Sequence, residues 1–184
     1  MTALLLEPHH DDAVLFASWT VLRHRPHIVT CFASYVQEAR GGPHDATRDR
    51  ETEAALRHLN APSWQKLPVR DDHPDSEMLE ALLREIDADQ EWTVVFAPAV
   101  ELGGHDHHNL VGHLAEEVFG RERLQPYLTY VRGQGRSRSA NEVPFEPHWP
   151  ALKFRAMSAY SSQINLPDCR PWFAADDMLR EWYE

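Results

Sequence analysis

Cysteine is nearly absent from this sequence. Its 184 residues include two cysteines, Cys31 and Cys169, and these do not form a C-x-x-C pair. A disulfide framework needs more cysteines than this, and a thiolate zinc site needs closely spaced ones. The low cysteine content therefore excludes a disulfide-rich scaffold and a zinc site built from thiolates.

Long apolar runs and basic residues are also scarce. No apolar run is long enough to span a bilayer, and the N-terminus lacks the positive charge and the apolar stretch of a signal peptide. Lys and Arg number 18 against 29 Asp and Glu, so the formal net charge is -11 at pH 7. Such a surface repels phosphate backbones. We therefore expect a cytoplasmic protein with no membrane span and no nucleic-acid partner, and we take the basic stretch Arg132–Arg138 as a solvated loop.

Strand-like and helix-like segments alternate along the chain. Short apolar runs predict strands at Ala3–Leu6, His27–Phe32, Lys66–Val69, Thr93–Ala97 and Tyr127–Val131. Helix patterns begin near Asp12 and cover Thr47–Leu59, Glu77–Ile86 and Asn109–Phe119, with two more helices closing the chain. This alternation predicts an α/β fold, a Rossmann-like three-layer αβα arrangement with a mostly parallel sheet. The length suits a single domain over residues 1–184.

Twelve histidines are the unusual feature of the composition. Two clusters of His and Asp, His9–Asp12 and His105–His108, each follow a predicted strand. In open parallel sheets, ligands bind beyond the carboxyl ends of the strands, where loops from distant parts of the sequence meet. We therefore expect both clusters to face one site.

Two histidines and one aspartate form a ligand set that suits zinc and leaves a fourth position open. Zinc lowers the pKa of bound water to roughly 7 and polarises a carbonyl group, so an amide becomes open to attack at neutral pH. A second carboxylate can accept the proton of the water, and Asp11 and Asp12 are placed to divide these tasks. The alternative is structural: Asp12 as a helix N-cap, and His105–His108 as a polar turn.

Four ordered motifs resemble those of the PIG-L/LmbE-like de-N-acetylase family. The family's first motif, AHPDDE or SPHLDDA, corresponds to Pro8–Ala13, and its second, H-x-D-H, corresponds to His105–His108. A helix pattern R-x-x-E-x-x-x-A begins at Arg48, and K-x-x-A-x-x-x-Y/H-x-S-Q runs from Lys153 to Gln163. Together the four motifs cover nearly the whole chain.

The resemblance implies a zinc-dependent hydrolase that removes an N-acetyl group from an amino sugar or glycoconjugate, such as an N-acetylglucosamine derivative. It assigns Zn²⁺ to His9, Asp12 and His108. Asp11 matches the family's general base, and His105 matches the histidine that stabilises the oxyanion. Arg48 matches a substrate-binding position, although an ion pair with Glu51 on a solvated helix face is an equal alternative.

Three positions depart from the family pattern. His10 stands where many members have proline, and Ala13 replaces the glutamate of the AHPDDE form. His107 occupies the place of the aspartate that orients and charges the neighbouring histidine, and Asp106 is the candidate to replace that aspartate. The departure at His107 bears directly on the chemistry expected of His105.

Two other functions fit the same residues. A non-haem Fe(II) enzyme also uses two histidines and one carboxylate, although its usual scaffold is a β-barrel-like jelly roll and this sequence alternates strands with helices. A non-catalytic metal-binding or ligand-binding member of the family is the second. The sequence does not identify the acyl acceptor, and it leaves open whether copies of the chain form a homo-oligomer.

Overall fold

The computed structural model describes residues 2–34, 45–129, 141–166 and 179–184. Its strands form one seven-stranded sheet in the order β3-β2-β1-β4-β5-β7-β6. In chain order these strands are β1 (Ala3–Glu7), β2 (His27–Ala33), β3 (Ser63–Arg70), β4 (Val94–Pro98), β5 (Leu124–Tyr127), β6 (Asn141–Glu142) and β7 (Trp182–Tyr183). Strands β1 to β5 pair in parallel, and β7 pairs antiparallel with β5 and with β6.

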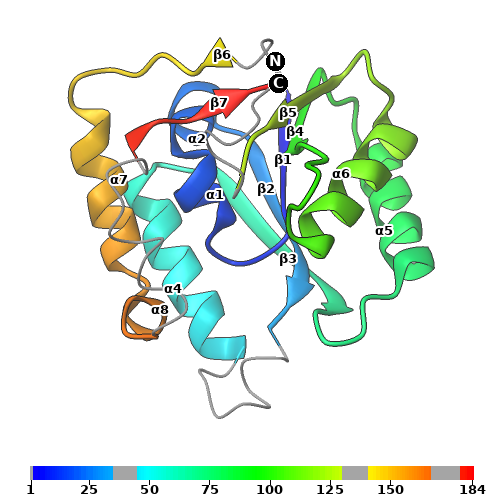
Figure 1. Cartoon of the computed structure of the whole chain (residues 1–184), viewed down its shortest axis with the longest axis horizontal. Coiled ribbons are helices and arrows are strands. Elements are labelled where there is room, and N and C mark those ends of the chain that lie inside the picture. Colours follow the sequence, from blue (N-terminus) through cyan, green and yellow to red (C-terminus); the bar gives the residue numbers. More distant parts are fainter. Residues whose placement is uncertain (1, 35–44, 130–140, 167–178) are drawn as a thin grey trace.

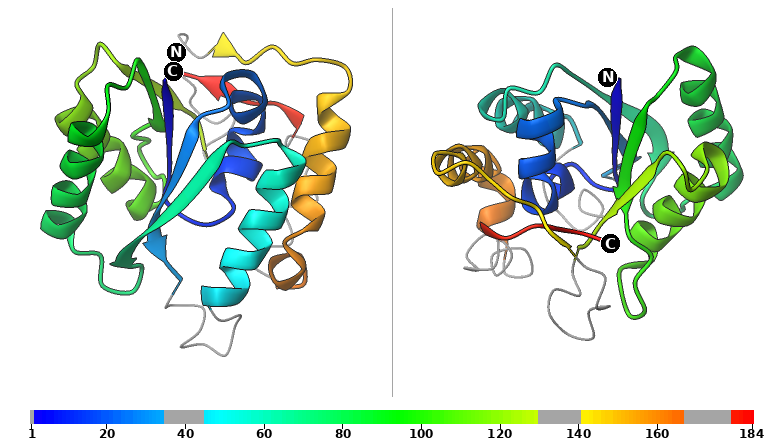
Figure 2. Two further views of the ribbon diagram at one scale, coloured as in Figure 1. Left: turned by 180° about the vertical axis from the view of Figure 1, so that it is seen from behind. Right: turned by 90° about the horizontal axis from the view of Figure 1, so that it is seen from above.

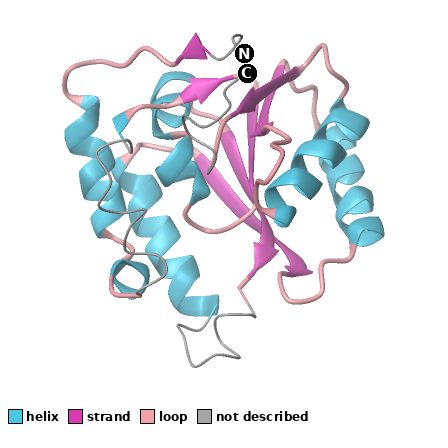
Figure 3. Cartoon of the chain, viewed as in Figure 1, coloured by secondary structure: helices cyan, strands magenta, loops and turns pink. Residues whose placement is uncertain are grey.

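Helices cover both faces of the sheet (Figures 1 and 2). The described helices are α1 (Asp12–Phe16), α2 (Ser18–His24), α4 (Asp45–His58), α5 (Ser76–Asp89), α6 (Asp106–Phe119), α7 (Trp149–Ser158) and α8 (Ser161–Ile164). Helices α5 and α6 pack on one face, while α1, α2, α4, α7 and α8 lie on the other. The three-layer α/β fold with a mostly parallel sheet is therefore confirmed (Figure 3).

Strand β1 lies at the centre of the hydrophobic core. All five of its residues are buried, as expected of a parallel strand with helices on both sides. Leu5 packs into the cluster beneath α1, α4 and α7, whereas Leu4 and Leu6 pack into the cluster beneath α5 and α6. Each buried leucine contributes about 1.5–3 kcal/mol to stability. Burial on both faces thus holds the end of β1, where the first His/Asp cluster begins.

Helix α6 lies unusually close to strand β4. A Cβ atom at Gly112 would approach the carbonyl oxygen of Pro98 to 2.5 Å, and a side chain there would force the two elements apart. Glycine in a helix interior costs about 0.5–1 kcal/mol relative to alanine. The close packing of α6 on β4 therefore explains why position 112 is glycine. This contact fixes the position of α6 one turn after His108.

Several predicted boundaries need correction. Strand β5 covers Leu124–Tyr127, so the predicted strand Tyr127–Val131 began too late and was wrong at Leu128 and Thr129. Pro126 makes this strand difficult to predict, because proline lacks an N–H donor and is rare in central strands. In the structure its carbonyl oxygen accepts a hydrogen bond from the backbone N–H of Glu184. The short antiparallel strands β6 and β7 were not predicted. The stretch Arg132–Arg138 and the last residues of the predicted strand lie outside the described residues.

Helix α6 begins at Asp106, three residues before the predicted start at Asn109. His105 is its N-cap, and its ring nitrogen Nδ1 accepts a hydrogen bond from the backbone N–H of His107. The alternative of a polar turn over His105–His108 was therefore wrong, since His107 and His108 lie in the first turn of the helix. The N-cap of α1 is Asp11 rather than Asp12, and it makes no side-chain capping bond. In the described parts of the chain, no helix is both long and apolar enough to cross a membrane.

Candidate active site

The loops after β1 and β4 bring the two His/Asp clusters together. These strands are adjacent and parallel, with Leu4 opposite Val95, so both loops leave the same edge of the sheet. The first loop carries His9 between β1 and α1, and the second carries His105 between β4 and α6. The expectation that both clusters face one site agrees with this placement.

His9, Asp12 and His108 meet at the base of this site. The Oδ2 atom of Asp12 lies 3.3 Å from Nδ1 of His9 and 3.2 Å from Nε2 of His108. One ligand atom from each residue lies within 4.8 Å of the other two. The Asp12 and His108 side chains are almost completely buried. The three residues predicted as metal ligands are therefore close enough to share one ion.

The carboxylate of Asp12 is suited to bind a cation. Burial alone would raise its pKa, but the charges and hydrogen bonds of His108 and His9 outweigh burial and hold the pKa far below its ordinary value. Its second oxygen, Oδ1, is buried and has no hydrogen-bond partner among the described residues. A buried anionic oxygen without a partner costs several kcal/mol unless a cation or donor meets it. The residues present thus fit a bound metal ion.

Arg48 reaches this site from helix α4. Its Nη2 atom lies 3.2 Å from Oδ2 of Asp11, and its guanidinium stacks over the ring of Tyr160 at 5.7 Å. The side chain is 2% exposed, so the alternative of an ion pair on a solvated helix face was wrong. The Nε and Nη1 atoms have no hydrogen-bond partner among the described residues. Arg48 therefore contacts the carboxylate of Asp11 through one nitrogen, while two others make no hydrogen bond to the described residues.

His105 lies at the mouth of the site, with its ring edge-on to His9 at 5.1 Å between centroids. Burial, and then the charges of His9 and His108, lower its pKa to about 4. Because Nδ1 accepts the hydrogen bond from the backbone of His107, the proton of the neutral ring lies on Nε2. A neutral His105 can therefore donate one hydrogen bond toward the site.

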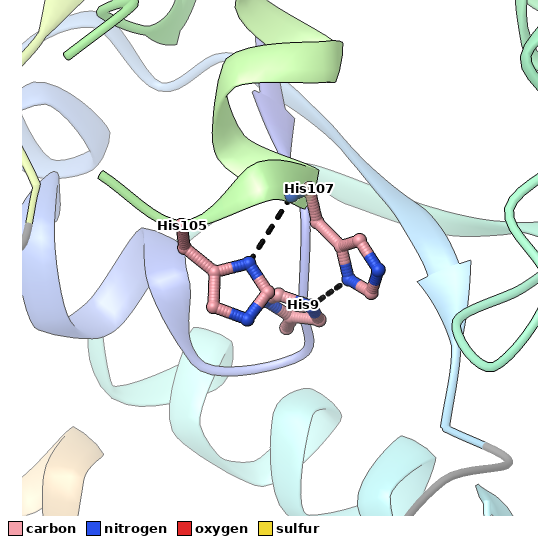
Figure 4. A group of neighbouring side chains, drawn as sticks. All are labelled: His9, His105 and His107. Carbon is pink, nitrogen blue, oxygen red and sulfur yellow. Dashed lines mark hydrogen bonds between the residues drawn. The ribbon is translucent and has the colours of Figure 1, made fainter. Parts of the chain in front are cut away.

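His107, the main departure from the family pattern, lies against His9. Its Nδ1 atom is 2.9 Å from Nε2 of His9, and the two rings are joined by a hydrogen bond (Figure 4). Burial, and then the charge of His9, lower the pKa of His107 to about 4. Asp106 is exposed in the first turn of α6, and its proposed role as a replacement for the family aspartate stays a prediction.

Sequence reasoning missed the role of His10. Its buried ring contacts Ser34 Oγ at 3.0 Å through Nδ1 and Asp49 Oδ1 at 2.9 Å through Nε2. Lys66 pairs with the same Asp49 and with Asp45, so an ammonium group already occupies the space between the carboxylates. No local pattern signals these contacts, because they join the segments after β1 and β2 with β3 and α4.

The two remaining motifs contact each other and the first loop. Glu51 on α4 accepts hydrogen bonds from the hydroxyls of Ser161 and Ser162. Tyr160 donates its hydroxyl proton to the carbonyl oxygen of His10 at 2.5 Å. Lys153 is fully buried, where it donates to the carbonyl oxygen of Leu15 and pairs with Glu181. These residues support the site without lining it.

Comparison with protein families gives one match. The sequence model of the PIG-L family, described as GlcNAc-PI de-N-acetylase, matches residues 4–119. This range contains both His/Asp clusters and Arg48. A search of curated proteins finds no match.

Solved structures share the fold at low sequence identity. The A40926 pseudoaglycone deacetylase Dbv21 is 20% identical with a TM-score of 0.75, covering 99% of this chain and 95% of that one. N,N'-diacetylchitobiose deacetylase from Pyrococcus horikoshii is 18% identical with a TM-score of 0.74, covering 100% and 82%. GalB, the 4-carboxy-2-hydroxymuconate hydratase from Pseudomonas putida KT2440, is 16% identical with a TM-score of 0.63, covering 94% and 83%. Since a hydratase shares the fold, the reaction must be argued from the site.

Proposed function

This chain belongs to the PIG-L family, and on that premise we propose that it is a zinc-dependent hydrolase that removes an N-acetyl group from an amino-sugar-containing small molecule. An N-acetylglucosamine derivative is the proposed substrate. The observation that carries the proposal is the convergence of His9, Asp12 and His108 within 4.8 Å, beside the carboxylate of Asp11. The family is described as de-N-acetylases, and two of the structures with this fold are named as deacetylases of sugar-containing compounds.

His9, Asp12 and His108 would hold the ion. Two imidazole nitrogens and one carboxylate oxygen match a catalytic zinc site, and the spare oxygen of Asp12 supports this assignment. A zinc ion in such a site lowers the pKa of a bound water molecule and polarises the acetyl carbonyl. The protein residues around it then supply proton transfer and charge stabilisation.

Asp11 is the proposed general base and acid. It follows the metal-site residue His9 by two positions and precedes Asp12, and Arg48 holds its Oδ2 atom at 3.2 Å. The carboxylate would accept a proton from water as the hydroxyl adds to the carbonyl carbon. The same proton would pass to the amide nitrogen as the C–N bond breaks, so that acetate and a free amine leave. General acid–base catalysis of this kind contributes about 10²–10⁴-fold.

His105 is the proposed oxyanion donor. Its capping bond at Nδ1 puts the ring proton on Nε2, which would donate to the oxyanion. One such donor is worth about 2.7–4 kcal/mol of transition-state stabilisation. Arg48 would bind hydroxyl or anionic groups of the substrate through its Nε and Nη1 atoms. The planar guanidinium suits paired oxygens better than a lysine would.

The test is release of amine and acetate from N-acetylglucosamine and its derivatives, with metal content measured on the same protein. Zinc-containing wild type is expected to turn over at least one of these compounds, and Asp11→Asn to be about 10²–10⁴-fold slower with zinc retained. Glu117→Gln, which changes an exposed carboxylate of α6, serves as the control. Equal inactivity of wild type and Asp11→Asn across a broad panel would instead favour a non-catalytic binding protein. Iron in the purified protein together with oxygen consumption would favour the Fe(II) enzyme.

A further inference from the structure

The imidazole of His9 faces two different groups of ligands. Its Nδ1 atom lies 3.3 Å from the carboxylate of Asp12, on the inner side. Its Nε2 atom lies 2.9 Å from Nδ1 of His107, on the outer side. One ligand atom from each of His9, His105 and His107 lies within 4.8 Å of the other two. A second potential ligand set, made only of imidazoles, thus adjoins the first (Figure 4).

We propose that His9, His105 and His107 form a second, outer metal-binding site, which binds a transition-metal ion such as Zn²⁺, Cu²⁺ or Ni²⁺. The outer site goes beyond the proposed function and has only His9 and His105 in common with it. Three imidazoles suit these borderline metals, whereas Mg²⁺ and Ca²⁺ prefer oxygen ligands. The outer site would therefore select a narrower class of ions than a cluster of carboxylates.

The spacing of the rings supports this site. Nitrogen ligands lie about 2.0–2.1 Å from zinc, so in a tetrahedral site two of them are roughly 3.4 Å apart. The His9 and His107 nitrogens are 2.9 Å apart and would need to separate only slightly. His105 would bind through Nε2 once the proton of its ring moves to Nδ1, which ends the capping bond to the backbone of His107. Two of the three ligands come from the start of a single helix.

The charge around the rings also favours a cation. The carboxylates of Asp12, Asp11 and Asp71 all act electrostatically on His9. The amino end of α6 opposes a positive ion there, and Asp106 in the first turn of that helix offsets this effect. His105 is exposed and His107 half-buried, so the outer site is open to ions from solvent while the inner site is buried.

Occupation of the outer site would exchange one proton for one ion. The ion takes the place of the proton that joins the His9 and His107 rings, and that proton passes to water. His105 would bind the ion through Nε2, so the proton that Nε2 carries in the neutral ring would move to Nδ1, and Nδ1 would give up the hydrogen bond that it accepts from the backbone of His107. Nε2 is also the nitrogen proposed to donate to the oxyanion. An occupied outer site should therefore slow deacetylation by about 10²-fold or more, the effect of losing one oxyanion donor.

The test is metal stoichiometry of the full-length protein, titrated with Zn²⁺ after metal removal and followed by calorimetry and elemental analysis. We expect two ions per wild-type chain, one tight and one weaker, and one ion in His107→Ala. Asp12→Ala should lose the inner ion and keep the outer one. His113→Ala, an exposed histidine on the same helix, is the matched control and should bind two ions. Circular dichroism verifies that each variant is folded.

A second measurement identifies the ligands directly. Asp12→Ala loaded with one equivalent of Cu²⁺ should show nitrogen hyperfine coupling from several imidazoles by electron paramagnetic resonance, and the added change His107→Ala should remove it. A single bound ion in wild type, or two ions in His107→Ala, would overturn the proposal, whether or not the protein is an active deacetylase. If instead Asp12→Ala kept both ions, the inner site would fail. If wild type bound two ions but released no amine from any of the acetylated compounds, the proposed function would fail while the outer site stood.

Discussion

The loops after β1 and β4 both lead into the site, but they are held in different ways. The carbonyl oxygen of His10, in the first loop, accepts hydrogen bonds from Thr52 and Tyr160, and its ring bonds to Ser34 and Asp49. These partners come from three segments of the chain: the end of β2, helix α4 and the turn between α7 and α8. The first loop is thus buried, and hydrogen bonds from several segments hold it in place.

The second loop is exposed and makes mainly local contacts. Leu102 is fully exposed, and the backbone of Glu101 bonds to the side chain of Asn109 and to the N–H of Gly104. All of these residues lie within ten positions of one another. The difference indicates that the groups proposed for proton transfer and metal binding lie on a rigid support. The loop that carries His105 faces solvent, where a substrate must enter.

Removal of Asp12 is expected to have the largest effect. Asp12→Ala takes away the buried carboxylate that contacts both His9 and His108. Lewis-acid catalysis by a metal is worth several kcal/mol, so kcat/KM should fall at least about 10³-fold. Zinc added to wild type at 100 times its Kd should stabilise the fold by about 2.7 kcal/mol, and this gain should be much smaller in the variant. A variant with normal activity would contradict the inner site. Glu117→Ala, at an exposed position of α6, is the control.

Removing the hydrogen bonds that hold the first loop should lower the free energy of unfolding. His10→Ala leaves the Ser34 hydroxyl buried without its imidazole partner and removes the bond to Asp49. Loss of one partner of a buried hydrogen bond costs about 1–3 kcal/mol, which urea unfolding of the metal-free protein measures. Asp49 keeps its pairing with Lys66, which limits the loss. A change below about 0.5 kcal/mol would mean that the two loops do not differ as described.

Acid should weaken the fold through the outer histidines. Burial, and then the charge of His9, lower the pKa of His105 and of His107 from 6.5 to about 4. The unfolded chain therefore binds more protons between these values, and stability of the metal-free protein falls as pH decreases from about 6.5 toward 4. Both rings are partly exposed, so the effect is modest. Urea titrations of wild type and His107→Ala at pH 7 and pH 4.5 should show a shallower decline in the variant, and parallel declines would argue against these shifts.

Truncation in the second loop should have the smallest effect. Leu102→Ala removes a side chain that contacts solvent, so the free energy of unfolding should change by less than about 0.5 kcal/mol. The same urea experiment as for His10→Ala provides a direct comparison of the two loops. A larger loss would show that Leu102 is packed in solution.

Much of the fold was predictable because its signals are local. Apolar runs identified β1, β2 and β4, and the alternation of strands with helices identified the three layers. The antiparallel strands β6 and β7 have two residues each and no run that a periodic pattern could detect. Strand β5 was misplaced because Pro126 lies inside it.

In the site, too, some features were predictable from the sequence and others were not. The sequence named His9, Asp11, Asp12, Arg48, His105 and His108. In the structure His9, Asp12 and His108 form one cluster, the ring of His105 lies against His9, and Arg48 contacts Asp11. Their catalytic and metal-binding roles stay predictions. Two contacts were not predicted. The ring of His10 bonds to Asp49 on α4, and the ring of His107 bonds to that of His9.

The sequence by itself determined the family, the layer order and the set of chemical groups, because each follows from residues that are near neighbours along the chain. Only the tertiary structure decided which groups meet. His107 bonds to a ring 98 positions away, and Arg48 turns from its own helix toward Asp11. Such pairings depend on how closely strands and helices pack, as the approach of Gly112 to Pro98 illustrates.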